Sequence, residues 1–193
     1  MDSFTFSMMQ LARGAPRRKI VVMGVSGSGK TTIGGLLARR LGAVFLEGDD
    51  FHPSANVEKM RKGIPLGDID RWPWLDRFGI AMADADGDVV GACSALKRSY
   101  RDRIRGLAGK DVRFVLLKAS EPTLAARLNS RPGHFMPATL LASQLATLEP
   151  LGNGEENSFA VDAEHAPDAV LEVALACLKS GRESAVADAT GPK

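Results

Sequence analysis

Five short apolar runs punctuate this chain, and between them apolar positions recur at the spacing of a helix. The runs are rich in Val, Ile, Leu and Phe and predict strands at residues 19–25, 43–46, 88–93, 112–117 and 158–161. Strands that are apolar on both faces are typical of a parallel sheet covered by helices on each side. The pattern therefore predicts an α/β fold with three layers, α/β/α, around a central five-stranded parallel sheet.

The helical spacing predicts seven helices, at residues 30–41, 54–61, 74–85, 97–106, 121–129, 137–148 and 167–179. The first is expected to end at Gly42, because glycine readily adopts the left-handed backbone found at helix ends. The stretch from residue 51 to residue 73 is longer than a crossover between strands needs. Loops of that length in a compact domain are usually functional.

Length and composition fit one domain. With 193 residues, of which 45% are hydrophobic, the chain can bury one full core but not comfortably two. We place this domain at residues 19–182, with a flap at about residues 127–140. Residues 1–18 and 183–193 are expected to be disordered extensions, although Arg13, Arg17 and Arg18 leave an organelle-targeting role open for the first.

Charge and cysteine usage narrow the function classes. The formal net charge is +2 and the basic residues are scattered among acidic ones, so no nucleic-acid partner is expected. No apolar run approaches the ~20 residues of a membrane span, so no membrane partner is expected either. Cys93 and Cys177 lie in apolar segments without metal-ligand spacing. They predict reduced core thiols in a cytoplasmic protein.

The most specific motif directly follows the first strand and matches the phosphate-loop pattern G-x-x-x-x-G-K-[ST]. Its residues are Gly24, Val25, Ser26, Gly27, Ser28, Gly29, Lys30 and Thr31. The glycines let the backbone wrap, so that successive N–H groups and the start of the next helix point at the phosphates of a nucleoside triphosphate. Lys30 is expected to contact the β- and γ-phosphates, and the Thr31 hydroxyl to bind Mg²⁺.

A phosphate-loop enzyme also needs a carboxylate, and the second strand supplies the candidate. The third strand, where this acid is commonly found, ends here in residues 91–94 without one. Asp49 follows the second strand, at the sheet edge where ligands bind. We expect it to order a magnesium-bound water or to accept the proton of an attacking hydroxyl. The alternative is that Asp49 or Asp50 merely caps the next helix.

Arg127 and Arg131 lie four residues apart at the end of a predicted helix, just before Pro132 and Gly133. Two guanidinium groups on one helical face, next to a hinge, suit a helical flap that closes over the triphosphate. There they would stabilise the charge that moves between donor and acceptor. The alternative is a solvated pair of arginines at a helix C-terminus.

Four further residues are candidates for binding a second substrate. His52 suits a hydrogen bond to a polyol, with a structural histidine as the alternative. Lys97 and Arg101 share one face of a predicted helix at the binding edge and suit an anionic acceptor. Arg71 would add a polar contact beside two tryptophans, which are as typical of a core as of a site.

Together these motifs resemble the gluconokinases, ATP-dependent kinases of D-gluconate with a P-loop kinase fold related to those of shikimate and adenylate kinases. The resemblance covers residues 19–179. Besides the phosphate loop it rests on residues 46–53, 56–60, 63–66, 68, 70–71, 73–75, 93–97, 100–102 and 133–135. The phosphate loop alone identifies a superfamily, whereas the His-Pro pair at 52–53 and the Cys-Ser-Ala-Leu-Lys stretch at 93–97 are far more specific.

The resemblance implies transfer of the γ-phosphate of ATP to the 6-hydroxyl of D-gluconate, which gives 6-phosphogluconate and ADP. It also implies a cytoplasmic enzyme, often a homodimer, that feeds the pentose phosphate or Entner–Doudoroff routes. Combined with the residues, it assigns catalysis to Lys30, Asp49, Arg127 and Arg131. It assigns the gluconate site to His52, Arg71, Lys97 and Arg101. Residues 162–165 are expected near the adenine because they follow the last strand.

Two other interpretations stay open from the residues. A kinase of shikimate or of a nucleoside monophosphate would use the same phosphate loop. A nucleotide-dependent switch or regulatory binding protein would use the loop without an acceptor pocket. The sequence lacks the Asn-Lys-x-Asp motif that is typical of a guanine switch.

Overall fold

The computed structural model describes residues 17–130, 138–152, 155 and 157–180. In this part of the chain, five parallel strands form one sheet in the order β2-β3-β1-β4-β5. The strands are β1 (Lys19–Met23), β2 (Val44–Glu47), β3 (Val89–Ala92), β4 (Arg113–Lys118) and β5 (Phe159–Asp162). The predicted five-stranded parallel sheet is confirmed.

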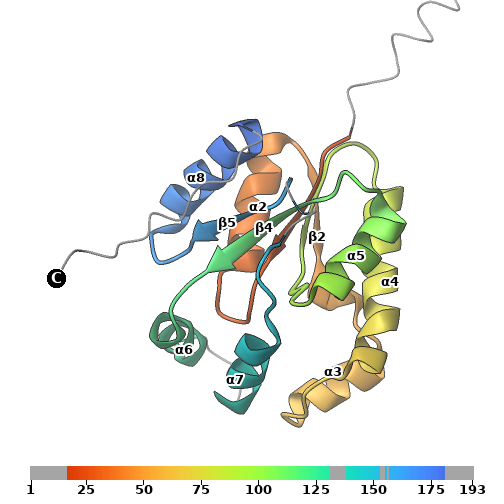
Figure 1. Cartoon of the computed structure of the whole chain (residues 1–193), viewed down its shortest axis with the longest axis vertical. Coiled ribbons are helices and arrows are strands. Elements are labelled where there is room, and N and C mark those ends of the chain that lie inside the picture. Colours follow the sequence, from red (N-terminus) through yellow and green to blue (C-terminus); the bar gives the residue numbers. More distant parts are fainter. Residues whose placement is uncertain (1–16, 131–137, 153–154, 156, 181–193) are drawn as a thin grey trace, which may run out of the picture.

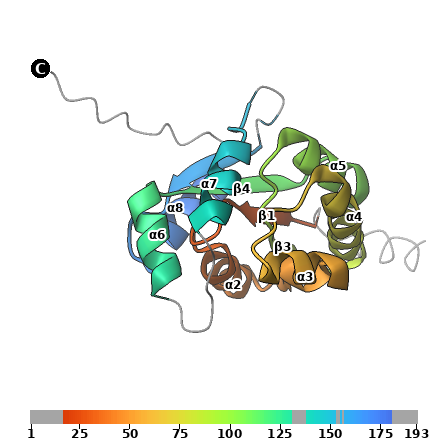
Figure 2. The same ribbon diagram turned by 90° about the horizontal axis from the view of Figure 1, so that it is seen from below.

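Helices cover both faces of the sheet, which confirms the three-layer arrangement. Helices α2 (Lys30–Leu41) and α8 (Pro167–Ser180) lie on one face, and α4 (Asp68–Asp84) and α5 (Arg98–Ala108) on the other (Figure 1). Three more helices gather at the carboxyl ends of the strands (Figure 2): α3 (Ser54–Arg61), α6 (Glu121–Asn129) and α7 (Ala138–Thr147). A short 3-10 turn, η1 (Gly48–Phe51), follows β2 at the same edge. Ligands bind at this edge in open parallel sheets.

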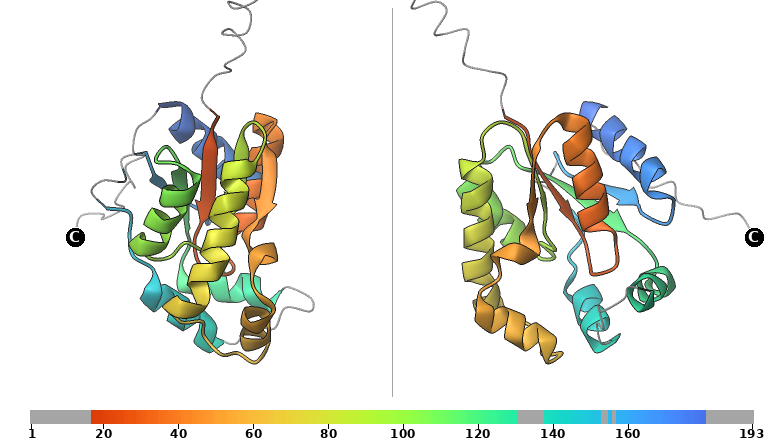
Figure 3. Two further views of the ribbon diagram at one scale, coloured as in Figure 1. Left: turned by 90° about the vertical axis from the view of Figure 1, so that its right-hand side faces the viewer. Right: turned by 180° about the vertical axis from the view of Figure 1, so that it is seen from behind.

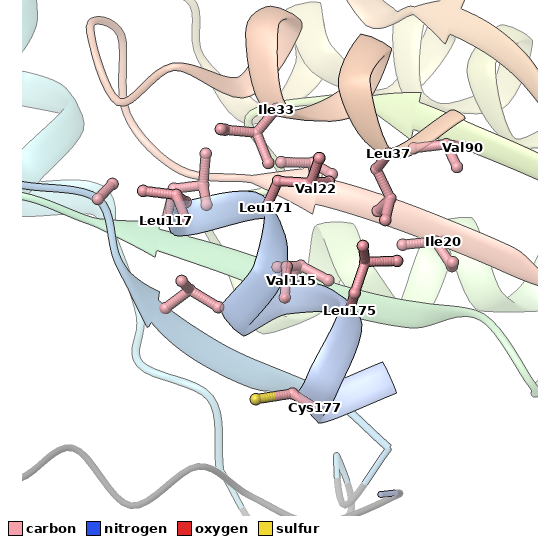
Figure 4. Packing of buried hydrophobic residues seen from close by; sticks show 14 of the residues in the cluster. Ile20, Val22, Ile33, Leu37, Val90, Val115, Leu117, Leu171, Leu175 and Cys177 are labelled. Carbon is pink, nitrogen blue, oxygen red and sulfur yellow. The ribbon is translucent and has the colours of Figure 1, made fainter. Parts of the chain in front are cut away.

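The alternation of side chains along β1 explains how the sheet holds both layers of helices, which Figure 3 shows from two sides. Ile20 and Val22 belong to the buried cluster that includes Leu37 of α2 and Leu175 of α8 (Figure 4). Val21 and Met23 belong to the opposite cluster, with Trp74, Phe78, Tyr100 and Ile104. Burying each such side chain contributes about 1.5–3 kcal/mol. Cys177 and Cys93, neither of which forms a disulfide, are buried in the first and second cluster respectively, as expected of core cysteines.

Helix α4 begins at Asp68, whereas the sequence predicted a start at residue 74. Proline lacks an N–H and is disfavoured in a helix interior, so a helix that runs through Pro73 departs from the usual pattern. The structure keeps Pro73 inside the helix. The carboxylate of Asp70 accepts a hydrogen bond from the Gly67 N–H over 2.9 Å and so caps the first turn. The earlier start brings Asp68 and Arg71 onto a helix that faces α5.

At the opposite edge, the first described residues join the sheet layer. The Arg18 N–H donates to the Asp88 carboxylate over 2.6 Å, and the Arg17 guanidinium donates to the Ala85 carbonyl. The expectations for residues 1–16 and 181–193 lie outside the described residues. None of the helices described here is both long enough and apolar enough to cross a membrane.

Candidate active site

The phosphate loop joins β1 to α2 at the carboxyl edge of the sheet. Gly24, Gly27 and Gly29 have φ angles of 140°, 82° and 95°, which other residues rarely adopt. A Cβ on Gly24 would lie only 2.8 Å from the Leu117 carbonyl oxygen of β4. Since Gly29 at the N-cap has no side chain, it does not cap the first-turn N–H groups of α2. The start of α2 is therefore suited to an anion.

Two polar groups of the loop also favour a bound anion. The Lys30 ammonium donates to the Val25 carbonyl over 3.0 Å, which places its charge over the loop. The Ser28 hydroxyl is buried and has no hydrogen-bond partner among the described residues. An unpaired buried hydroxyl costs about 1–3 kcal/mol, and a phosphate oxygen would supply its missing partner.

Asp49 lies in η1, directly after β2, with an exposed carboxylate. Its position is set by its neighbour Gly48, whose carbonyl accepts a hydrogen bond from the Trp74 indole over 2.7 Å. A Cβ on Gly48 would lie 2.3 Å from the Ala92 carbonyl oxygen, so only glycine allows η1 to pack this closely against β3. Helix α3 begins at Ser54, with Pro53 at its N-cap. Neither Asp49 nor Asp50 therefore caps that helix, which removes the structural alternative.

Glu47, the last residue of β2, is a second carboxylate beside Asp49 that the sequence prediction missed. One of its oxygens accepts from the Asp49 N–H at 3.5 Å. The other, Oε2, is buried without a hydrogen-bond partner in the described part of the chain. The position of Glu47 at the end of a strand was the sequence signal that could have identified it as a site residue. Residues 17–130, 138–152, 155 and 157–180 contain no group of three or more His, Cys, Asp or Glu that could hold a metal ion.

The environment of Cys93 shows how close these charges lie. Burial raises the pKa of the thiol to about 12, the carboxylates of Asp49 and Glu47 add to this rise, and Lys30 opposes it. Lys30, Asp49 and Glu47 thus act on the same buried group at the end of β3. A neutral, buried thiol is not a nucleophile.

A cleft of about 460 Å³ opens beside the phosphate loop. It brings together five of the predicted site residues: Ser26, Lys30, Asp49, His52 and Arg71. Apolar side chains from the segment that contains α3, among them Val57, Ile64 and Leu66, form one wall. Helix α7 contributes Leu140, Ser143 and Gln144 to the lining. The cleft therefore combines a charged end at the loop with a partly apolar wall.

His52 is held rigidly in this cleft. Its ring stacks on the indole of Trp74, with centroids 4.2 Å apart and an interplanar angle of 15°. Its Nδ1 lies 3.5 Å from the Asn56 amide nitrogen, and its Nε2 lies 3.9 Å from an oxygen of Asp49. Burial lowers the pKa of His52; Asp49 partly offsets this effect and Arg71 adds to it. The imidazole is therefore neutral near pH 7 and can both donate and accept one hydrogen bond.

Arg71 and Lys97 belong to a network between α4 and the start of α5. Lys97 Nζ contacts both carboxylate oxygens of Asp68, at 2.8 and 2.9 Å. The Tyr100 hydroxyl also donates to Asp68 and accepts from Arg71 over 3.1 Å. Hydrogen bonds from Lys97 and Tyr100 hold the pKa of Asp68 below its ordinary value. Both cations lie near Asp68, Lys97 at 2.8 Å and Arg71 at 4.0 Å, and Arg71 also lines the cleft.

The expectation that Arg101 meets the acceptor is corrected by its surroundings. Its side chain is fully buried and pairs with Glu155, Nε to Oε1 at 2.7 Å. It also donates to the carbonyls of Leu96 and Pro150, both at 3.2 Å. Because these partners occupy the guanidinium in the interior, Arg101 is a structural residue here. The helical periodicity grouped Arg101 with Lys97 on one face at the binding edge but could not show that its side chain meets the core.

Arg127 lies at a second cleft of about 300 Å³, which the phosphate loop also lines. Its guanidinium donates to the Ala163 carbonyl over 2.7 Å, so it is not simply solvated. The same cleft is lined by Gly27, Gly29 and His165. This places the segment after β5 beside the loop. Arg131, the other arginine of the predicted flap, lies outside the described residues.

Gln144 is a further residue that sequence reasoning missed. It lies within the helix predicted at residues 137–148, and its side chain reaches the backbone of Ser26 in the phosphate loop, 2.7 Å away. No local motif marks such a contact, because the two residues are far apart in the chain.

Comparisons with known proteins agree with this geometry. A family model described as an AAA domain matches residues 20–151. The gluconokinase of Gluconobacter oxydans (strain 621H) is 52% identical to this chain over 163 residues, which cover 82% of this chain and 90% of that protein. The crystal structure of a gluconokinase from Sinorhizobium meliloti 1021 is similar with a TM-score of 0.78 and 49% identity, covering 85% of this chain and 93% of that one. The shikimate kinase from Aquifex aeolicus vf5 shares the fold alone, with a TM-score of 0.53 and 17% identity over 84% of this chain and 96% of its own.

Proposed function

The chain belongs to the gluconokinase family, and on this premise we propose that it transfers the γ-phosphate of ATP to the 6-hydroxyl of D-gluconate. The products are 6-phosphogluconate and ADP. One observation carries the proposal: the cleft beside the phosphate loop contains Lys30 and Asp49 at its loop end and Arg71 in its lining. Gluconate has a matching polarity, because it is a linear polyol with its reacting hydroxyl at one end and a carboxylate at the other.

The phosphate loop and Lys30 bind the triphosphate. The N–H groups at the start of α2 and the ammonium of Lys30 hold the β- and γ-phosphates, and the Ser28 hydroxyl gains a phosphate oxygen as its partner. The same protein groups stabilise the negative charge that shifts between donor and acceptor oxygens during transfer.

The residues fit a magnesium ion that is held mainly by the phosphates. Thr31, in the first turn of α2, is suited to binding Mg²⁺ through its hydroxyl, and Asp49 to holding one of the waters of the ion. The buried, unpartnered Oε2 of Glu47 supports this fit, since an ordered water would give it a hydrogen bond. Bound Mg²⁺ supplies neutralising charge to the phosphate oxygens.

Three side chains orient the acceptor. Asp49 aligns the 6-hydroxyl and accepts its proton late in the transfer. His52, which is neutral and fixed on Trp74, hydrogen-bonds to a hydroxyl of the polyol. Arg71 pairs with the carboxylate, the group that distinguishes gluconate from glucose. Lys97 neutralises Asp68, which lies 4.0 Å from Arg71, and so leaves the positive charge of Arg71 available to the substrate carboxylate.

Arg127 and the segment after β5 bind the nucleoside end of ATP. The cleft of about 300 Å³, which both of them line together with the phosphate loop, supports this role. Arg131 remains the candidate for a charge-stabilising arginine of the flap. The homodimer and the cytoplasmic location implied by the resemblance stay predictions.

The reaction is tested by measuring ADP release with Mg-ATP in parallel tubes that contain D-gluconate, shikimate, glucose, AMP or no acceptor. Gluconate-dependent ADP release, with 6-phosphogluconate as the product, is expected. Release with shikimate or AMP instead would identify another acceptor. Equal slow hydrolysis in every tube would contradict the kinase proposal and favour a nucleotide-dependent switch.

A further inference from the structure

Gln144 connects helix α7 to the phosphate loop. Its Oε1 accepts a hydrogen bond from the backbone N–H of Ser26 over 2.7 Å, across 118 positions of sequence. Both residues line the cleft of about 460 Å³, together with Lys30 and Asp49. Gln144 thus lies where the phosphate loop meets the proposed acceptor site.

The packing of α7 fixes this position. Leu141, one turn before Leu145, is buried in a cluster with Val25 of the phosphate loop and Leu124 of α6. Leu145 packs against the same cluster. The neighbouring face of the helix carries Ser143 and Gln144 into the cleft. The backbone of Gln144 is therefore anchored on the loop that its side chain contacts.

The chemistry of the contact sets the orientation of the Gln144 amide. A backbone N–H only donates, so the group that faces Ser26 must be the carbonyl oxygen of the side chain. The NH₂ group then lies on the other branch of the amide and offers two donors. A neutral donor suits a hydroxyl oxygen and, unlike Lys30, adds no charge near the phosphates.

We propose that Gln144 is a specificity-determining residue for the acceptor, whose Nε2 donates to the hydroxyl on carbon 5, next to the reacting 6-hydroxyl. The inference rests on the proposed function, which puts the 6-hydroxyl at Lys30 and Asp49. The hydrogen bond between Oε1 and the Ser26 N–H fixes the orientation of the amide relative to the phosphate loop. The NH₂ group can therefore distinguish the two configurations at carbon 5.

The test compares D-gluconate with its epimer at carbon 5 in wild type, Gln144→Met and Gln144→Glu. The epimer is assayed both as a substrate and as a competitive inhibitor, so a ratio is obtained even where its turnover is slow. In Gln144→Met, kcat/KM for D-gluconate is expected to fall about tenfold or more, with a much smaller change for the epimer. The discrimination ratio should therefore fall about tenfold.

Gln144→Glu separates the two contacts of the amide. Glutamate keeps an oxygen that can accept from the Ser26 N–H but has no N–H donors. The inference predicts that this variant loses discrimination as Gln144→Met does. If Gln144→Glu keeps the wild-type ratio while Gln144→Met loses it, the Ser26 contact alone matters and the inference is wrong.

Thr147→Val is the matched control, because it removes a hydrogen bond on the same helix, from Thr147 Oγ1 to the Ser143 carbonyl at 2.7 Å. It should keep the wild-type discrimination. An equal loss of kcat/KM for both acceptors in the Gln144 variants would indicate a structural role and overturn the inference.

Wild-type formation of 6-phosphogluconate is measured in the same assay. Its absence would overturn the proposed function and this inference together, whereas its presence with unchanged Gln144 variants would overturn only the latter.

Discussion

Arg101 and Glu155 form a two-point ion pair in the interior, with Nε to Oε1 at 2.7 Å and Nη2 to Oε2 at 2.8 Å. Both side chains are 0% exposed. Through its bonds to the carbonyls of Leu96 and Pro150, Arg101 also joins the segment after β3 to the segment after α7. Because Leu96 and the side chains of α7 line the acceptor cleft, the pair holds two of its walls together.

Breaking this pair is expected to destabilise the fold. Arg101→Met leaves the Glu155 carboxylate buried with one partner fewer, and such a loss typically costs about 3–5 kcal/mol in the free energy of unfolding. The double variant Arg101→Met/Glu155→Leu should recover much of this, since both charges of the fully buried pair are then removed and Arg105, which also contacts Glu155, keeps Asp102. Urea unfolding measures the free energy of unfolding of the single and the double variant.

The control is Arg103→Met, which removes a partly exposed pair with Asp76 and should cost about 1 kcal/mol or less. Equal costs for Arg101→Met and Arg103→Met would contradict the prediction.

The same pair predicts how stability depends on acid. Burial alone would raise the pKa of Glu155, but hydrogen bonds from Arg101, the Gly152 N–H and Arg105 outweigh it and hold the pKa at about 2, below the ordinary 4.5. The unfolded chain therefore binds this proton more readily than the native state. The contribution is fully present above pH 4.5 and is lost as the pH falls towards 2.

Glu155→Gln should accordingly show a shallower fall in unfolding free energy between pH 4.5 and 2 than wild type, as measured by urea unfolding at a series of pH values. Glu164, whose pKa is also about 2 because of hydrogen bonds from Thr123 and Ser120, contributes in both proteins and so cancels in the comparison. Glu172→Gln, at an exposed position, is the control and should keep the wild-type slope. Identical slopes for wild type and Glu155→Gln would rule out this role.

The part of the candidate site at the phosphate loop could be predicted from sequence, because it depends on local rules. Lys30 belongs to a motif that contains its own turn residues, and Asp49 follows a strand whose carboxyl end must face the ligand edge. The strands themselves were predicted because both faces of the sheet are buried.

The residues that prediction missed or misplaced depend on contacts distant in sequence. Periodicity grouped Arg101 with Lys97, but its partner Glu155 is 54 residues away, and the pattern does not show whether an inner face meets a core or a cleft. Gln144 contacts Ser26 across 118 positions. The early start of α4 depends on the cap between Gly67 and Asp70, which outweighs the helix-breaking tendency of Pro73.

Replacing the Asp49 carboxylate should remove most turnover and spare the fold. Asp49 is exposed at the loop end of the cleft, so Asp49→Asn changes no buried packing, but it removes the proton acceptor. General base groups typically contribute about 10²- to 10⁴-fold, and kcat for gluconate phosphorylation should fall by that order. Asp50→Asn is the matched control: it alters the adjacent exposed carboxylate and should keep kcat within about twofold. Near-normal turnover in Asp49→Asn would show that the carboxylate has no catalytic role.

Arg127 provides a test that separates nucleotide binding from charge stabilisation. The sequence pattern suggested that Arg127 stabilises the charge on the phosphoryl group during its transfer. This role predicts that Arg127→Ala lowers kcat. The place of Arg127 in the second cleft, held on the Ala163 carbonyl at 2.7 Å, instead predicts a loss of ATP affinity, because the proposed function assigns that cleft to the nucleoside end of ATP. Loss of a guanidinium that stacks on or hydrogen-bonds to a base is worth about 1–2 kcal/mol, so KM for ATP should rise about tenfold while kcat changes far less.

Steady-state kinetics at saturating gluconate measure both constants, with Arg103→Ala on the exposed face of α5 as the control for loss of a surface arginine. A fall in kcat with unchanged KM for ATP would contradict the role in nucleotide binding. It would support the role predicted from the sequence, in which Arg127 stabilises the charge on the transferred phosphoryl group.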